Sequence, residues 1–345
     1  MDCCGLGPNP SEYTIALETY GLRLRCYAKG SGHGPPLLIV PAPIKRPYIW
    51  DLAPDRSVVR RAVAHGLAVF LVEWVETCPE SGSPGLADYA GHMLDACVNA
   101  ATKLSGFDKV IMAGHSLGGV FAALHAAYRP EHVAGLILVE VPLAFDGAFQ
   151  ATGEQDAHTL RALPVASAVP GSYLSLLSAQ AAPDIFCVSR YLDGLASMAT
   201  RNTLATHLRV ERWTMDELPM SRNLFEDVVQ RLYRENAFMR GEFEIDGVKL
   251  HPSRITAPLL SVFRPSSTLV TAQSVLAFHQ AAGSHEKKLV PYFGDVGVAL
   301  QHVGALVGDS AHRQVWPRVF QWIDRIIGKG QVRSPEPAVE CRSRR

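Results

Sequence analysis

The sequence predicts an α/β protein whose mostly parallel, doubly wound sheet carries a helical insertion. Two observations predict this fold class. Short runs of Val, Ile and Leu alternate with stretches of helical length along most of the chain, which is typical of a sheet with helices on both faces. Each run is continuously apolar, as expected of strands that are buried on both sides.

The elements follow one another in a regular order. Two strands, 13–17 and 22–27, are separated by Tyr20-Gly21 and are expected to pair as an antiparallel hairpin. The buried strands are expected at 37–40, 68–72, 109–113, 135–139, 259–263 and 288–292. Helices are expected at 57–65, 88–103 with Asp88 as N-cap, 117–128, 272–281 and 311–327.

The interval from Leu143 to Pro258 interrupts this alternation. It has no strong strand pattern and several helix-like stretches, so it is expected to form a helical cap over the strand ends, where ligands bind. The predicted organisation is therefore a core at 1–142 and 259–328, a helical cap at 143–258 and a disordered tail at 329–345.

Composition excludes several classes of protein. The 345 residues include 33 Lys and Arg against 33 Asp and Glu, which argues against a broad electrostatic nucleic-acid binder. No apolar run is long enough to span a bilayer, and the first residues do not resemble a secretory signal. Seven cysteines without a Cys-x-x-Cys pair predict free thiols in a reducing compartment, hence a cytoplasmic protein without a structural metal.

The chemistry-bearing motif is Gly114-His115-Ser116-Leu117-Gly118, between a predicted strand and a predicted helix. This is the context of a Gly-x-Ser-x-Gly nucleophile elbow, the hallmark of the α/β-hydrolase fold. Glycines are needed at 114 and 118 because strand and helix approach closely at such a turn. Ser116 is then the expected nucleophile, and the N–H of Leu117 is expected to stabilise an oxyanion.

A base and a second oxyanion donor complete the expected site. His302 follows the last predicted strand and precedes the closing helix, where chain order places the base of such enzymes. His115 is better placed for packing beside the elbow. The second donor is expected in the loop after the strand at 37–40, where Pro41 and Pro43 cannot donate, which leaves Ala42 or Ile44.

The acid of the triad is not where it is expected. The segment 264–270, after the strand at 259–263, contains no Asp or Glu. Glu140, at the end of the neighbouring strand, is the best replacement, with Asp146 and Asp295 as weaker candidates.

A further set of segments lies outside the elbow: Leu37-Leu38-Ile39-Val40-Pro41-Ala42-Pro43-Ile44-Lys45, Tyr48-Ile49-Trp50-Asp51-Leu52, Val69-Phe70-Leu71-Val72-Glu73-Trp74, Asp88-Tyr89, Leu232-Tyr233-Arg234-Glu235-Asn236-Ala237, Gly241-Glu242-Phe243, His302-Val303-Gly304 and Trp316-Pro317-Arg318. Together they resemble polyhydroxyalkanoate synthases, and the chain has a length similar to the short subunits of that family. The resemblance implies polymerisation of hydroxyacyl-CoA thioesters by a cysteine, an aspartate and a histidine. Mapped onto this chain, those positions are Ser116, Ser267 and His302, so two of the three depart from the family.

Three functional hypotheses follow. The first is a serine acyl hydrolase or acyltransferase that acts on an ester or an acyl-CoA or acyl-carrier thioester without a cofactor or metal. The second is a synthase-type polymerase of hydroxyacyl-CoA. The third is a catalytically impaired homologue that acts as a binding subunit. If the chain self-associates, a homodimer is the default expectation.

Overall fold

The computed structural model describes residues 6–27, 34–76, 82–145 and 168–328. Its central sheet has eight strands in the order β1-β2-β6-β3-β7-β8-β13-β14. The first two strands pair antiparallel, β2 is antiparallel to β6, and all later neighbours are parallel. The predicted doubly wound, mostly parallel sheet is therefore confirmed. Its strands are β1 (Thr14–Thr19), β2 (Leu22–Cys26), β3 (Pro36–Val40), β6 (Ala68–Trp74), β7 (Val110–His115), β8 (Val133–Val139), β13 (Leu259–Phe263) and β14 (Lys287–Pro291).

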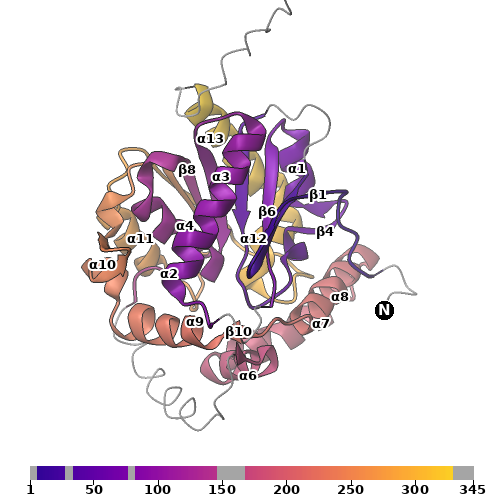
Figure 1. Ribbon diagram of the computed structural model, residues 1–345. Coiled ribbons are helices and arrows are strands. Elements are labelled where there is room, and N and C mark those ends of the chain that lie inside the picture. The colour runs from indigo at the N-terminus through magenta and orange to yellow at the C-terminus, as the bar shows by residue number, and fades with distance from the viewer. Residues whose placement is uncertain (1–5, 28–33, 77–81, 146–167, 329–345) are drawn as a thin grey trace, which may run out of the picture.

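Helices cover both faces of the sheet (Figure 1). One face is covered by α2 (Leu86–Asp88), α3 (Leu94–Ser105) and α4 (Leu117–Tyr128), and the other by α1 (Val58–Ala64), α12 (Gln301–Val307) and α13 (Trp316–Gly328). The helix α11 (Ala272–Ala281) has its predicted bounds. Each face carries its own hydrophobic cluster, because strands with two apolar faces need a covering layer on each side.

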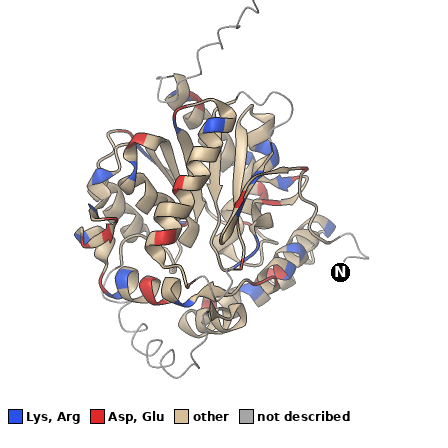
Figure 2. Ribbon diagram, viewed as in Figure 1, with Lys and Arg blue, Asp and Glu red and all other residues tan. Residues whose placement is uncertain are grey.

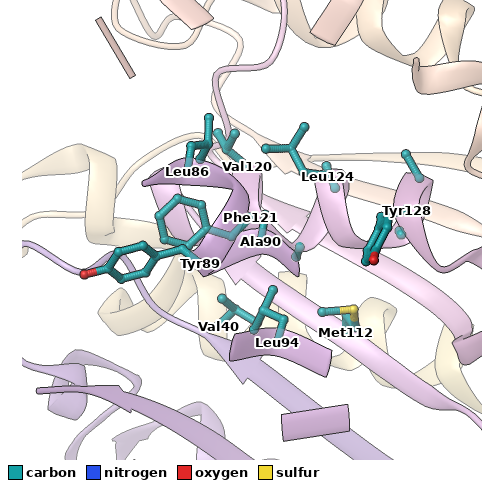
Figure 3. Close-up of a cluster of buried hydrophobic side chains, with 14 of the residues drawn as sticks. Val40, Leu86, Tyr89, Ala90, Leu94, Met112, Val120, Phe121, Leu124 and Tyr128 are labelled. Atoms are coloured by element: carbon teal, nitrogen blue, oxygen red, sulfur yellow. The ribbon is translucent and has the colours of Figure 1, made fainter. Parts of the chain in front are cut away.

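The cluster beneath α4 positions the motif residues (Figure 3). Phe121, Trp74 and Tyr89 pack ring against ring, with centroids 5.0–5.8 Å apart. Every residue of α4 from Gly118 to Tyr128 is buried. A helix that is apolar all round is held by tertiary packing on all sides, so the start of α4 is fixed relative to the sheet.

The start of the helix after β6 differs from the prediction. Asp88 is not its N-cap. The helix begins at Leu86, and the Asp88 carboxylate turns back to accept a hydrogen bond from the N–H of Gly85 at 2.8 Å. An acidic residue three positions into a helix can satisfy an amide at its start in this way.

The described part of the insertion contains five α-helices and also four strands of two or three residues, and its role as a cap remains a prediction. β9 (Ala168–Val169) pairs with β10 (Met220–Ser221), and β11 (Phe243–Ile245) pairs with β12 (Val248–Leu250). The helices are α6 (Gly171–Ala181), α7 (Ser189–Ser197), α8 (Arg201–Met215), α9 (Arg222–Asp227) and α10 (Ala237–Arg240).

The two parts of the insertion lie differently on the core. Helices α6 to α9 run along one edge of the molecule, below the sheet in Figure 1. The hairpin β11–β12 packs beside α4, where Phe243, Ile245 and Leu250 join the core cluster. The boundaries 143–258 remain a prediction, and the tail predicted at 329–345 lies outside the described residues.

The structure bears on two predictions from composition, the balance of charge and the absence of a membrane-spanning segment. Figure 2 shows basic and acidic residues interspersed over the described chain, in keeping with the equal numbers of the two. Within the described ranges, no helix combines the length and apolar character needed to cross a bilayer. Location in the cytoplasm stays a prediction.

Candidate active site

The Gly-x-Ser-x-Gly motif forms a sharp turn between β7 and α4. Ser116 has φ of 52°, a conformation that costs energy for a residue with a side chain. A Cβ at Gly114 would lie 2.5 Å from the Cα of Gly119, and one at Gly118 would lie 2.2 Å from the carbonyl oxygen of Val40. Both motif glycines therefore permit backbone contacts that a side chain would prevent.

A third glycine, to which the motif assigns no role, also shapes the elbow. A Cβ at Gly119 would lie 2.2 Å from a methyl group of Val141, which follows β8. The glycine pair at 118–119 thus lets the chain segments after β3 and after β8 both approach the start of α4. The repeated glycine was visible in the sequence, but its partner could be known only from the fold.

The loop after β3 lies beside the elbow, as a second oxyanion donor requires. Gly118 contacts Val40 and Pro41 directly. Farther along this loop, the carbonyl of Ile44 accepts a hydrogen bond from Leu218 of the insertion at 3.1 Å. Ala42 is therefore in the part nearer the elbow, and Ile44 in the part that pairs with the insertion.

His302 lies in the first turn of α12, and its side chain is 13% exposed. Its ring centroid is 4.6 Å from that of His115, and the His115 ring donates through Nε2 to the carbonyl of His302 at 2.9 Å. Burial lowers the pKa of His302 to about 4. The imidazole is therefore neutral at physiological pH, which is the form that a general base needs.

His115 has a packing position beside this histidine. Burial, followed by the nearby charge of His302, lowers the pKa of His115 to about 3. Because it is neutral and hydrogen-bonded to the backbone of His302, it links the elbow to the segment that carries the candidate base.

Glu140 directly follows β8 and has φ of 49°. Its side chain is 1% exposed, and Oε2 lies 3.9 Å from Nδ1 of His302. Nδ1 of His302 has no hydrogen-bond partner among the described residues. The separation exceeds a hydrogen bond, but catalytic contacts are often long before substrate binds.

The other carboxylate oxygen of Glu140 accepts a hydrogen bond from the backbone N–H of Arg264. Burial raises the pKa of Glu140 to about 8, against the opposing effects of Arg264 and of a hydrogen bond with the Ser267 side chain. Ser267, at the position where the resemblance implies an aspartate, therefore lies against the carboxylate of Glu140.

Of the two weaker acid candidates, only Asp295 lies in the described residues, and its carboxylate has other partners than His302. Asp295 accepts hydrogen bonds from Oγ of Ser310 at 2.6 Å and from the hydroxyl of Tyr292 at 3.0 Å. These contacts give it a structural role in joining β14 to the segment after α12. Asp146 lies outside the described residues.

A lysine next to the candidate oxyanion loop escaped the sequence analysis. Nζ of Lys45 lies 2.9 Å from Oε1 of Glu217 and 3.2 Å from Oγ of Ser175, both in the insertion. Burial lowers the pKa of Lys45. Its partners are more than a hundred residues away in the chain, so no local pattern could reveal them. Within the described ranges, His, Cys, Asp and Glu side chains form no cluster of three suited to a metal ion.

Comparison with known proteins agrees with the fold. A family model described as the alpha/beta hydrolase fold matches residues 35–168. A monoacylglycerol lipase from Paleococcus ferrophilus superposes with a TM-score of 0.56 at 14% identity, covering 90% of this chain and all of that one. A carboxylesterase structure from Nitrososphaera gargenis gives 0.55 at 12% identity, covering 92% of this chain and all of the other. The chain has the α/β-hydrolase fold.

Sequence comparison is more specific. The poly(3-hydroxyalkanoate) polymerase subunit PhaC of Haloferax mediterranei is 27% identical over 341 residues, which is 97% of this chain and 68% of that protein. The subunit of Allochromatium vinosum is 26% identical over 84% of this chain and 80% of its own length. That of Cupriavidus necator is 35% identical over 108 residues, 30% of this chain and 18% of its own.

Proposed function

We propose that this chain, which has the α/β-hydrolase fold and is similar to polyhydroxyalkanoate synthases over most of its length, transfers acyl groups from an ester or a hydroxyacyl thioester through an acyl-enzyme on Ser116. His302 is the general base. Glu140 takes the place of the usual aspartate, since it orients the imidazole of His302 and stabilises its protonated form. The observation that supports this most is the buried carboxylate of Glu140, 3.9 Å from Nδ1 of His302. It supplies the third group that the segment after β13 lacks.

The proposed reaction has two halves. As Oγ of Ser116 attacks the carbonyl carbon, its proton passes to His302, and the negative charge on the carbonyl oxygen is stabilised by backbone N–H groups. Leu117 at the start of α4 supplies one donor. Ala42 is favoured over Ile44 as the second donor, because Pro41, the residue before Ala42, lies against Gly118. His302 then returns the proton to the departing thiolate or alkoxide, and an acceptor hydroxyl releases the acyl group.

The nature of the acceptor separates the two enzymatic hypotheses. An oxygen ester on Ser116 is less activated than the thioester of a cysteine enzyme, so transfer to water or a small hydroxyl compound is easier than chain extension. Polymerisation is the second candidate, and the similarity to polymerase subunits over 97% of the chain favours it. In that case the acceptor is the hydroxyl of another hydroxyacyl unit.

The decisive experiment is intact mass spectrometry after treatment with a fluorophosphonate, on the parent and on Ser116→Ala. We expect one covalent adduct on the parent and none on the variant, with a loss of turnover of about 10⁴-fold or more. A folded parent that forms no adduct would contradict the proposal and favour the binding subunit.

A second experiment identifies the acceptor. With 3-hydroxybutyryl-CoA as probe, release of CoA is followed by thiol detection and the acyl product by mass spectrometry. Free 3-hydroxybutyrate identifies hydrolysis, and a ladder of oligomers identifies polymerisation. Ser116→Ala is the blank for both products.

A further inference from the structure

A second buried carboxylate comes from the insertion and contacts the loop that leads into α12, the helix that carries His302. Asp193, in α7, accepts hydrogen bonds from the backbone N–H groups of Gly297 at 2.9 Å and Ala299 at 2.8 Å, one on each oxygen. Its side chain is 7% exposed. Charged acceptors make stronger hydrogen bonds to backbone amides than neutral ones do, so the carboxylate fixes this loop firmly.

The loop needs such a restraint because its backbone is unusual. Gly297 has φ of 84° and Ala299 has φ of 55°. A non-glycine residue at positive φ costs energy and persists only where its surroundings hold it. His302 lies three residues beyond Ala299, so a change in this backbone would reorient the first turn of α12.

The insertion also contacts the loop from a second helix. A Cβ at Gly297 would lie 2.5 Å from the carbonyl oxygen of Thr203, near the start of α8. The loop is thus enclosed between the Asp193 carboxylate of α7 and the backbone of α8.

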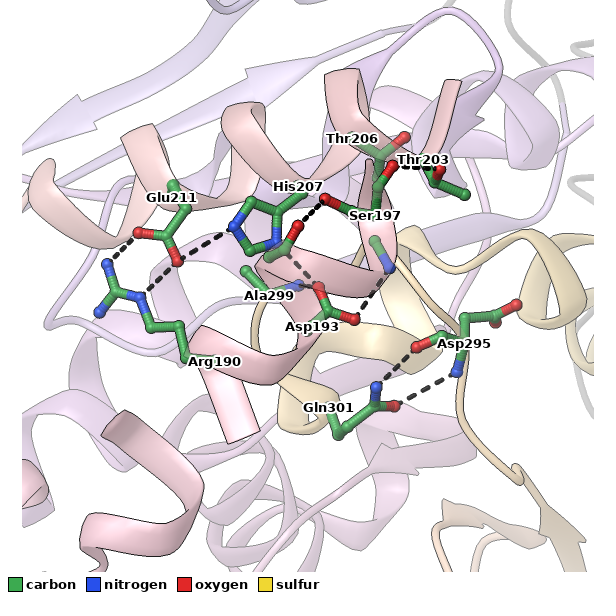
Figure 4. Close-up of polar contacts among 12 residues, drawn as sticks. Arg190, Asp193, Ser197, Thr203, Thr206, His207, Glu211, Asp295, Ala299 and Gln301 are labelled. Atoms are coloured by element: carbon green, nitrogen blue, oxygen red, sulfur yellow. Dashed lines mark hydrogen bonds and ion pairs between the residues drawn. The ribbon is translucent and has the colours of Figure 1, made fainter. Parts of the chain in front are cut away.

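Asp193 is itself held by its neighbours (Figure 4). Nδ1 of His207, in α8, lies 2.8 Å from Oδ2 of Asp193, and Nε2 lies 3.8 Å from Oε1 of Glu211. Arg190 forms an ion pair with Glu211 and donates to Oγ1 of Thr214 at 2.8 Å. The chain Arg190–Glu211–His207–Asp193 fixes the rotamer of the carboxylate that holds the loop.

We propose that Asp193 is a positioning residue, which sets the imidazole of His302 for catalysis by fixing the backbone at Gly297 and Ala299. The inference rests on the proposed function, because it assumes that His302 acts as the base. It assigns the insertion a task beyond the expected covering of the strand ends. Part of the catalytic machinery is held in place from outside the core.

The test is Asp193→Asn in the full chain. An asparagine can accept with its oxygen, but its NH₂ group would face one of the two backbone donors, so one hydrogen bond is lost. We expect the rate of fluorophosphonate labelling and kcat to fall about tenfold, with KM almost unchanged. A loss confined to the chemical step distinguishes positioning from general damage to the substrate site.

Asp227→Asn is the matched control. Asp227 also joins the insertion to the core through a backbone donor, the N–H of Leu86 at 2.8 Å, but this donor is in α2, on the opposite face of the sheet from α12. It should label at the parent's rate. Folding of each variant is followed by circular dichroism and Tm.

The outcomes separate the two proposals. A parent that is not labelled refutes the proposed function. A parent that is labelled, together with a folded Asp193→Asn that is labelled equally fast, refutes only the role of Asp193. If Asp193→Asn does not fold, His207→Gln replaces it, since it removes the ring that holds the Asp193 carboxylate in its rotamer and so weakens the two loop hydrogen bonds without changing Asp193 itself. A severalfold fall is then expected, and labelling at the parent's rate by folded His207→Gln overturns the inference.

Discussion

Two neighbouring strands, β8 and β13, end side by side at the candidate site in different ways. Val139 pairs in register with Val262, so the residues that follow them lie at the same edge of the sheet. After β8 comes Glu140, buried and at positive φ, whereas β13 continues into Arg264 and exposed Ser266. The strand that usually supplies the acid has none, and its neighbour supplies a carboxylate instead.

The two strand ends indicate that a catalytic triad depends on the relative positions of its side chains and not on which strand carries the acid. Adjacent strands are about 4.8 Å apart, and glutamate is one methylene longer than aspartate. A carboxylate can therefore reach the same imidazole from either strand end. The backbone of Arg264 and the side chain of Ser267 then hydrogen-bond Glu140 rather than His302.

Glu140→Gln is expected to have the largest effect, a loss of the reactivity of Ser116. Gln can still accept from Arg264 but cannot balance the charge of an imidazolium, so labelling of Ser116 should fall by about 10³–10⁴-fold. Rates are measured with a fluorophosphonate on folded protein. Glu73→Gln, which alters a buried carboxylate on β6 that pairs with Arg25, is the control and should keep its reactivity. A variant that labels like the parent would show that Glu140 is structural.

Moving the acid back to the end of β13 tests whether that strand end can still serve His302. The double variant Glu140→Gln and Ser267→Asp places a carboxylate where the resemblance implies one. Because Ser267 already lies against the side chain of Glu140, we expect about 10- to 100-fold recovery over Glu140→Gln alone. Ser267→Asn in the same background is the uncharged control. If both double variants behave alike, the position after β13 no longer reaches His302.

The pH dependence of labelling tests the protonation of Glu140. Its pKa is raised to about 8 by burial, so the carboxyl is mostly protonated at pH 7 and mostly ionised at pH 9. Only the ionised form stabilises the imidazolium, and His302 is already neutral across this range. The labelling rate should therefore rise about tenfold from pH 7 to pH 9 and then level off. Glu140→Gln should lose this rise, and a flat parent profile would contradict the assignment.

The sequence predicted what local patterns encode. Continuous apolar runs predicted the strands of the sheet. The elbow motif predicted the turn at Ser116, because its glycines are required by close contacts with neighbouring backbone. Chain order placed His302 after the last strand. By contrast, Lys45 with Glu217 and Asp193 with Ala299 join residues more than a hundred positions apart. Such contacts depend on how the insertion packs, for which a single sequence carries no periodic signal. The short strands of the insertion were missed because two or three residues form no pattern.

The smallest expected effect is on stability. Between about pH 4.5 and pH 8 the unfolded chain has released the proton of Glu140 while the folded protein keeps it, because burial raises its folded pKa. The folded state therefore loses stability as pH rises through this window. Glu140→Gln removes the titrating group, so its Tm should match the parent near pH 4.5 and exceed it by about 2 °C or more at pH 8.5. The measurement is differential scanning calorimetry of both proteins across this range. If the parent is as stable as the variant at pH 8.5, the fold stabilises the charge of the Glu140 carboxylate, most directly through His302. Protonation of Glu140 would then not limit the rate of the reaction at neutral pH.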